Sequence, residues 1–278
     1  MENKKNFYIN GKWVTPKSKE EIKVIDPATE ENCAVITLGN KDDVNDAVNA
    51  AKKAYSSWAF SSKDERIRLL EKLYENYKKR WADIANAITI EMGAPKDFAT
   101  KLQAGTGAAH LKSFIRYLKN FEFEKPLGEH APNQRLIYEP KGVCALITPW
   151  NWPMNQVCLK VMPAIASGCT MVLKPSELAP LSSMILAELI DETKVPAGVF
   201  NLDLNAKKHV FIAGGVGITP LISMLYEAID NGIKPENILF IQCQRDETSQ
   251  ILKEELASLQ REAGFRYKTS FMVSDNGD

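Results

Sequence analysis

The sequence lacks an excess of charge of either sign. Its 278 residues carry 35 Lys and Arg against 35 Asp and Glu, so the formal net charge at pH 7 is zero. Proteins that bind nucleic acid, acidic membranes or polyanionic substrates usually carry a basic field that attracts them. We therefore expect no nucleic acid partner. The composition, 45% apolar and 25% charged, is ordinary for a globular chain.

Long apolar runs are also missing. The N-terminal stretch MENKKNFYINGKWV contains charges but no apolar core of the kind that a secretory signal needs, and no later run approaches the length of a membrane span. The sequence accordingly predicts a protein without a membrane partner, located in the cytoplasm.

Cysteines are few and far apart. The five are odd in number and no two have the close spacing of a zinc or iron–sulfur site, so we expect reduced thiols and no metal. Four of them fall in predicted core strands or a predicted core helix, where a buried, inert thiol is the expectation. These are Cys144, Cys158, Cys169 and Cys243.

The first 120 residues are predicted to be mainly helical after an extended N-terminal segment. Apolar residues recur at helical spacing over 41–60, and Ser62 with Glu65 forms a capping box before a long helix or a broken pair over 63–92. Gly93 and Pro95 end that stretch. A further helix is expected over about 98–120, followed by a charged turn, FEFEKPLGEHAPN.

After about residue 134 the pattern changes to short runs of β-forming residues that alternate with helical stretches. This alternation is typical of β–α–β units and a parallel sheet, so the predicted fold class is α/β with Rossmann-like units. The predicted strands are RLIYEP, VCALITP, CTMVLKP, GVFNL, HVFIAGG, NILFIQC and YKTSFMVS; the predicted helices are 154–167, 180–193, about 220–231 and 246–263.

The spacing of two of these strands predicts a boundary. GVFNL (198–202) and HVFIAGG (209–215) are separated by only six residues, whereas neighbouring parallel strands need a crossover of a dozen or more. The two runs therefore cannot be parallel neighbours. Either the sheet reverses or two sheets abut, and both alternatives place a seam at about 202–208.

Two motifs before the seam carry candidate chemistry. In TPWNWP (148–153), two prolines fix the backbone around Asn151 just past a predicted strand, where open α/β sheets bind ligands, so Asn151 could donate to an oxyanion. A simple tight turn is the alternative. In LKPSE, Lys174 and Glu177 could hydrogen-bond ribose hydroxyls, and solvated loop charges are the alternative.

Taken together, these segments resemble the aldehyde dehydrogenase superfamily. The supporting motifs occur in the family's order over roughly the first 202 residues: YINGKWV, IDPATEE, TPWNWP, PAIASGCTMVLKPSE and VPAGVFNL. The resemblance implies a Rossmann-like fold that binds NAD or NADP. It further implies that Asn151 is an oxyanion donor, that Lys174 and Glu177 bind the adenosine ribose, and that Thr148, Pro149 and Trp150 line the nicotinamide side.

The sequence departs from that family after GVFNL. The resemblance leads one to expect a glycine-containing pyrophosphate segment, a general-base Glu and a nucleophilic Cys, and none follows. An oxyanion donor acts only where a nucleophile generates the oxyanion. We therefore expect residues 1–202 to be an incomplete cofactor-binding portion without its nucleophile and base.

A second glycine-rich motif follows the seam. FIAGGVGITP places glycines between an apolar strand and a helix, where backbone amides can approach a pyrophosphate. GGVGITPLISML resembles the nucleotide-binding module of ferredoxin–NADP reductase-like flavoprotein reductases, again incomplete, over about 203–278. The resemblance implies that the dinucleotide contacts Gly214, Gly215, Gly217, Ile218 and Thr219, with Arg245 near the ribose or a 2′-phosphate. Arg245 as an exposed loop residue is the alternative.

No flavin is expected, because the Arg-x-Tyr-Ser/Thr signature of the flavin domain is missing and FRYKTS (265–270) lacks that arrangement. Three hypotheses remain open: an aldehyde dehydrogenase-like enzyme using NAD(P), a dinucleotide-binding protein without turnover, and a natural or constructed chimera. We expect a chimera of two oxidoreductase fragments that binds NAD(P) without turnover, and apolar surface left exposed for self-association. The enzyme is the alternative.

Overall fold

The computed structural model describes residues 5–204, 209–214, 218–230, 232–244, 246 and 248–271. The chain groups into two compact units, residues 1–205 (unit 1) and 206–278 (unit 2). Strand β9 (Phe200–Leu202) and strand β10 (His209–Gly214) belong to different sheets, as the short connection between them requires. Residues 205–208 of the predicted seam lie outside the described residues.

A five-stranded mixed sheet forms the centre of unit 1. Its order is β2-β1-β9-β8-β7, in which β7 (Val143–Ile147), β8 (Thr170–Lys174) and β9 are parallel. Helices α6 (Pro153–Ser167) and α7 (Leu181–Thr193) connect these three strands, so the predicted β–α–β units are confirmed. The short strands β1 (Phe7–Ile9) and β2 (Lys12–Val14) extend the sheet, with β1 antiparallel to β9.

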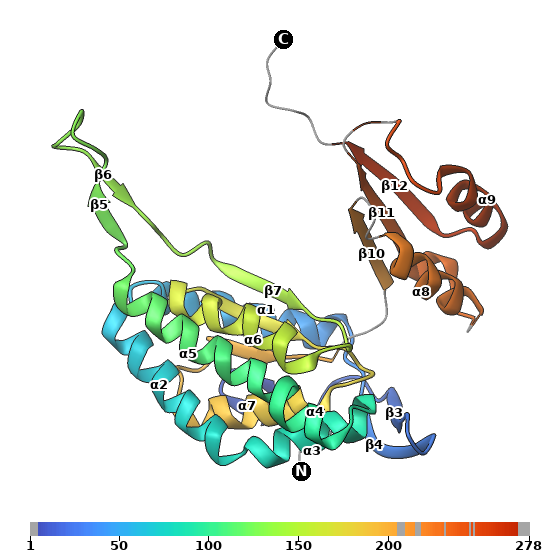
Figure 1. The fold of residues 1–278 in the computed structure, drawn as a ribbon, viewed down its shortest axis with the longest axis horizontal. Coiled ribbons are helices and arrows are strands. Elements are labelled where there is room, and N and C mark those ends of the chain that lie inside the picture. Colours follow the sequence, from blue (N-terminus) through green and yellow to red (C-terminus); the bar gives the residue numbers. More distant parts are fainter. Residues whose placement is uncertain are drawn as a thin grey trace. The chain divides into compact units, whose positions relative to one another are not determined.

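Helices cover the sheet of unit 1 (Figure 1). Helix α1 (Lys41–Trp58) lies behind the strands in that view and contacts β7, β8 and β9, while α6 lies in front. Helices α2 (Lys63–Lys79) and α5 (Ala104–Asn120) pack on α6, and α3 (Trp81–Met92) packs on α7. The core therefore lies between the sheet and these helices, and Trp58, Leu70 and Tyr77 are buried in it.

Local signals explain the helix ends. The Ser62 hydroxyl accepts from the Glu65 amide at 3.1 Å and begins α2, and the predicted broken pair is confirmed because α2 and α3 separate at Arg80. Gly93 ends α3 with a φ of 73°, a left-handed conformation that suits glycine. The predicted helix at 98–120 consists of α4 (Lys96–Phe98), a π-helical turn η1 (Ala99–Gln103) and α5.

One strand prediction for unit 1 was wrong, whereas the predicted extended N-terminal segment is confirmed. The run RLIYEP is not part of the parallel sheet; its strand β6 (Arg135–Ile137) pairs antiparallel with β5 (Glu124–Pro126), which lies in the predicted charged turn. The five residues between β6 and β7 are too few for a parallel crossover, so β6 pairs with β5 in a hairpin that projects from the helices of unit 1 (Figure 1). The extended N-terminal segment also forms a separate two-stranded sheet from β3 (Glu21–Asp26) and β4 (Glu31–Thr37).

Unit 2 has a parallel three-stranded sheet in the order β10-β11-β12. After β10 the chain forms helix α8 (Ile218–Asp230), a short 3₁₀ turn η3 (Pro235–Asn237) and strand β11 (Ile238–Gln244). Helix α9 (Lys253–Ala263) then leads to strand β12 (Arg266–Phe271). Helix α9 begins later than predicted, because the Asp246 carboxylate accepts from the Thr248 hydroxyl and the Ser249 amide and holds a turn there. Ile218, Leu225, Phe240, Leu256 and Phe265 form part of a separate core.

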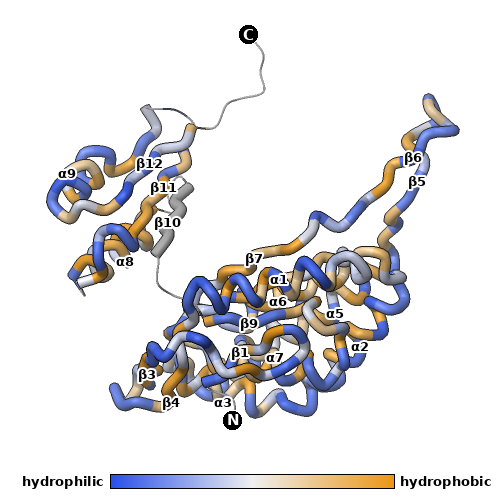
Figure 2. Tube along the Cα trace, turned by 180° about the vertical axis from the view of Figure 1, so that it is seen from behind, coloured by the Kyte–Doolittle hydropathy of each residue, from blue (hydrophilic) through white to orange (hydrophobic). Residues whose placement is uncertain are grey.

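The hydropathy along the chain varies between the elements of unit 1 (Figure 2). The helices of unit 1 alternate between hydrophilic and apolar segments, whereas β6 and β7 are apolar along most of their length. Ile137 of β6 is 61% exposed and Ile147 of the outer strand β7 is 67% exposed. Among the described residues, no helix combines the length and the apolar content that crossing a membrane requires.

Candidate dinucleotide site

The two motifs of unit 1 meet at the carboxyl ends of neighbouring strands. Ile147 of β7 lies opposite Lys174 of β8, and the Thr148 amide donates to the Lys174 carbonyl oxygen at 3.2 Å. TPWNWP and LKPSE, far apart in the sequence, therefore begin at the same edge of the sheet. This edge is where ligands bind in open α/β folds.

Lys174 and Glu177 form an ion pair at this edge. Lys174 Nζ lies 2.6 Å from Glu177 Oε2, and the two side chains are only 25% and 20% exposed. Ser176, buried between them, accepts from the Leu178 amide at 3.3 Å and fixes the turn. The pair is thus held in place by a folded turn, unlike two separately solvated loop charges. A paired ammonium and carboxylate can respectively donate to and accept from neighbouring hydroxyls of a ribose.

The TPWNWP motif places the side-chain amide of Asn151 just before helix α6. Thr148 is buried, Pro149, Trp150 and Asn151 are exposed, and α6 begins at Pro153. Asn151 therefore lies just before the amino end of α6, where the helix dipole favours negative charge. This position suits the oxyanion donor that the resemblance implies.

Trp152 supports this turn by a packing contact that the sequence did not predict. Trp152, the residue before α6, packs edge-on against Phe98 with 5.5 Å between the ring centroids. Phe98 comes from the last turn of α4, so the helical part of unit 1 supports the motif. The only signal in the sequence was an aromatic residue next to Asn151, and it did not indicate the partner.

A cavity of about 250 Å³ lies beside the same strand ends. Trp150 of TPWNWP and Leu178, the residue after LKPSE, line it together with Glu91 of α3 and residues of β3. Glu91 is a buried carboxylate that accepts from the Leu181 and Ser182 amides at the start of α7. In the sequence, Glu91 stands out only as a single acidic residue on the apolar face of a predicted helix.

The thiols of unit 1 lie away from Asn151. Cys144 and Cys169 are at the amino ends of β7 and β8, at the opposite edge of the sheet. Cys158 is fully buried in α6, and burial raises its pKa to about 12, as expected for an inert thiol. Cys33 of β4 donates to the Val24 carbonyl oxygen at 3.2 Å.

Full burial was the wrong expectation for Cys144 and Cys243, which are both partly exposed. Cys144 belongs to the outer strand β7, and Cys243 alternates with the buried residues of β11 on the less covered face.

Unit 2 has a strand before and a helix after the glycine-rich motif, as the sequence predicts. Gly214 ends β10 opposite Cys243, and α8 begins at Ile218, with Thr219 in its first turn. The Ile218 side chain is completely buried in the core of unit 2, so a contact with a dinucleotide would come from its backbone. Gly215, Gly217 and Arg245 lie outside the described residues. Over the part of the chain that the structure describes, no three His, Cys, Asp or Glu side chains gather as a metal site.

Comparisons with known proteins match the two units separately. Residues 13–210 match the model of the aldehyde dehydrogenase family, and residues 211–277 match an oxidoreductase NAD-binding domain. A 3-succinoylsemialdehyde-pyridine dehydrogenase from a Pseudomonas species is 49% identical over 203 residues, which are 73% of this chain but 42% of that enzyme. The chain therefore spans less than half the length of this curated relative.

Solved aldehyde dehydrogenases resemble nearly the whole chain and are longer than it. An aldehyde dehydrogenase from Bartonella henselae is 40% identical with a TM-score of 0.74, over 95% of this chain and 59% of that one. An aldehyde dehydrogenase variant from Pseudomonas syringae, crystallised with NAD⁺ and octanal, is 29% identical with a TM-score of 0.72, over 94% of this chain and 61% of that one.

Proposed function

The chain belongs to the aldehyde dehydrogenase family, and on that premise we propose that it is an oxidoreductase that binds NAD or NADP and oxidises an aldehyde. The observation that carries the proposal is the meeting of Thr148 to Asn151 with the Lys174–Glu177 pair at one edge of the sheet. The comparisons support this hypothesis better than the expected binding protein without turnover.

In the proposed site, each motif has a separate task. Lys174 and Glu177 hold the adenosine ribose, Thr148, Pro149 and Trp150 line the nicotinamide side, and Asn151 donates to the oxyanion of the substrate. Bound NAD(P) supplies the acceptor for the hydride. In unit 2, we propose that the glycine-rich segment 214–217, with Ile218, Thr219 and Arg245, forms a second dinucleotide site.

Aldehyde-dependent formation of NADH or NADPH by the purified chain tests the activity. Medium-chain aliphatic and semialdehyde substrates are the first choices, each with both cofactors. The Asn151→Ala variant should lower kcat by about 100-fold, the usual effect of losing one oxyanion donor. Dinucleotide binding without reduction in the presence of every aldehyde would contradict the activity and leave the binding intact.

One observation favours a second candidate function, dinucleotide binding without turnover. Of the thiols that the structure describes in unit 1, Cys144 and Cys169 lie at the opposite edge of the sheet from Asn151, and Cys158 is fully buried. On this hypothesis the chain is a chimera whose two portions, about 1–202 and 203–278, are both incomplete. The turnover assay distinguishes the two candidates.

Removing the Lys174 ammonium should weaken dinucleotide binding to unit 1. We expect Lys174→Ala to raise the Kd of NAD(H) or NADP(H) about tenfold or more, because it removes charge-assisted hydrogen bonds to the ribose and leaves Glu177 without this cation. Calorimetric titration of both cofactors measures the effect. Lys101→Ala is the matched control, because Lys101 forms an exposed ion pair with Asp97 in the η1 region.

The Gly217→Ala variant identifies which unit binds. If both units bind a dinucleotide, Lys174→Ala should weaken the binding to unit 1 and Gly217→Ala the binding to unit 2, so that each variant removes one of the two binding events seen in the titration. Unchanged titrations for Lys174→Ala would contradict the role given to LKPSE.

We further propose that the chain acts in the cytoplasm and self-associates through apolar surface. Ile137 of the β5–β6 hairpin and Ile147 of the outer strand β7 are both more than half exposed. Strand edges and apolar patches of this kind favour association. A single monomeric species in sedimentation velocity would contradict the association.

A further inference from the structure

The amino ends of β7 and β8 bring two cysteines to one face of the sheet. In the parallel register, Cys144 lies opposite Met171, and Cys169 precedes Met171 by two residues. Because side chains alternate along a strand, Cys144, Met171 and Cys169 share one face. The two thiols are close enough for each to affect the pKa of the other. They form a diagonal cross-strand pair.

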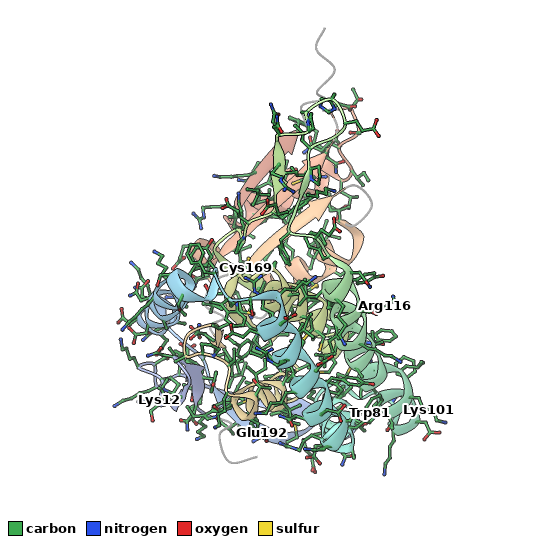
Figure 3. The ribbon with its side chains drawn as sticks, turned by 90° about the vertical axis from the view of Figure 1, so that its left-hand side faces the viewer. Lys12, Trp81, Lys101, Arg116, Cys169 and Glu192 are labelled. Carbon is green, nitrogen blue, oxygen red and sulfur yellow. The ribbon has the colours of Figure 1, made fainter. Side chains whose placement is uncertain are left out.

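The surroundings of the two sulfur atoms differ. Cys169 (labelled in Figure 3) is buried, and its Sγ accepts from the Ser167 hydroxyl at 3.4 Å, with the backbone amides of Lys141 and Gly142 also near enough to influence its pKa. These donors stabilise a thiolate and hold the pKa of Cys169 below its ordinary value despite burial. Cys144 is partly exposed, and burial and the neighbouring Cys169 raise its pKa to about 11.

A buried cation lies beside this pair. Arg66 of α2 is 4% exposed, and a Cβ at Gly168, the residue before Cys169, would come within 2.5 Å of Arg66 Nη2. The guanidinium donates to the Ser61 hydroxyl and to the carbonyl oxygens of Ala59 and Ala166, all neutral acceptors. A buried positive charge among neutral acceptors favours an anion nearby, and the Cys169 thiolate would supply one.

A cavity lies on the side of Arg66, the buried cation beside the pair. This cavity, of about 330 Å³, is lined by Arg66, Lys63, Tyr138 and Pro140 among others. Pro140 directly precedes Lys141, whose backbone amide influences the pKa of Cys169. The cavity is polar enough and large enough to admit a molecule the size of hydrogen peroxide.

From this geometry we propose that Cys144 and Cys169 form a thiol–disulfide modification site that takes hydroperoxides as the oxidant. The Cys169 thiolate attacks one peroxide oxygen and breaks the O–O bond, which gives a sulfenic acid; the leaving hydroxide takes the proton released from Cys169 and departs as water. The Cys144 sulfur then attacks the Cys169 sulfur, forming the S–S bond, and the sulfenic hydroxyl leaves with the Cys144 proton as a second water. The two thiols are oxidised by two electrons and one peroxide is reduced.

Peptide mapping of the full chain tests this proposal. The reduced protein is treated with one equivalent of hydrogen peroxide, alkylated and digested without reductant. We expect an intramolecular Cys144–Cys169 disulfide that dithiothreitol reverses, formed about tenfold faster than any oxidation of Cys33. If Cys144 and Cys169 are both recovered alkylated while Cys33 or Cys243 is oxidised, the proposal is wrong.

Variants separate the roles of the two thiols. In Cys144→Ser, peroxide should leave a sulfenic acid at Cys169 that dimedone traps, whereas in Cys169→Ser dimedone should not label Cys144. Cys33→Ser is the matched control and should form the disulfide at the wild-type rate. Dimedone labelling of Cys144 in place of Cys169 would overturn the assignment. The mapping of the unmodified chain remains decisive if a variant does not fold.

Discussion

Replacing Gly198 with alanine should destabilise unit 1 by about 3–5 kcal/mol. Gly198 leads into β9 with a φ of 86°, and an added Cβ would lie 2.5 Å from the Ala50 carbonyl oxygen and 3.0 Å from the Ala54 Cβ. Both contacts belong to the second half of α1, whose backbone cannot move without disturbing its packing on β8 and β9. The substitution therefore adds a steric clash to an unfavourable backbone conformation.

Urea unfolding followed by tryptophan fluorescence measures this effect in unit 1 alone. All five tryptophans, at positions 13, 58, 81, 150 and 152, lie in that unit. Gly142→Ala is the matched control, because Gly142 has a φ of 127° but no atom within 4 Å of an added Cβ. Gly142→Ala should lower the free energy of unfolding by only about 1–3 kcal/mol, the cost of placing alanine in a positive-φ conformation. Equal losses for the two variants would show that the approach of α1 to Gly198 is not close.

The stability of unit 1 should fall as the pH rises from about 4.5 to about 7, through the ionisation of Glu91. Burial raises the pKa of this carboxyl from 4.5 to about 7, and the hydrogen bonds from Ser182 and Leu181 only partly oppose that rise. Below pH 4.5 both the folded and the unfolded states hold the proton. Between pH 4.5 and 7 the unfolded state loses it first, so unfolding is favoured, and above pH 7 the dependence ends. The total change is about 3 kcal/mol.

Comparison with Glu91→Gln isolates this contribution from other titrating groups. The variant cannot ionise, so the difference in unfolding free energy between the wild type and Glu91→Gln should fall by about 3 kcal/mol over that interval. The variant itself should be less stable than the wild type at pH 4.5, because one helix amide loses its acceptor at the start of α7. A difference that stays constant between pH 4.5 and 7 would mean that Glu91 is ionised throughout.

Regular elements with local signals could be predicted from the sequence. The Ser62 cap and the helix end at Gly93 follow from residues within a few positions of each helix end, and the structure has both, whereas the position of the break at Arg80 was not predicted. The hairpin of β5 and β6 could not be predicted in the same way. Its exposed strands carry no alternating pattern, and only the short distance from β6 to β7 excludes RLIYEP from the parallel sheet.

The sequence predicts the candidate site residues that lie at the strand ends. It does not predict the residues that hold them in place through packing and hydrogen bonds. Lys174 and Asn151 follow predicted strands, so the rule for open α/β sheets was enough to bring them together. Trp152 with Phe98, and Glu91 with the start of α7, depend on contacts between segments 54 and 90 residues apart, respectively. Residue spacing along the chain contains no information on such contacts.

The antiparallel pairing of β1 with β9 also determines when unit 1 can fold during synthesis. Tyr8 pairs with Leu202, and the Asn10 amide donates to Asn201 Oδ1 at 3.0 Å, 191 positions later in the chain. The N-terminal strand must therefore wait on the ribosome until nearly all of unit 1 has emerged from the exit tunnel. Over that time its apolar residues Phe7, Tyr8 and Ile9 are without their final partner strand, which makes the nascent chain a natural client for a chaperone that binds early.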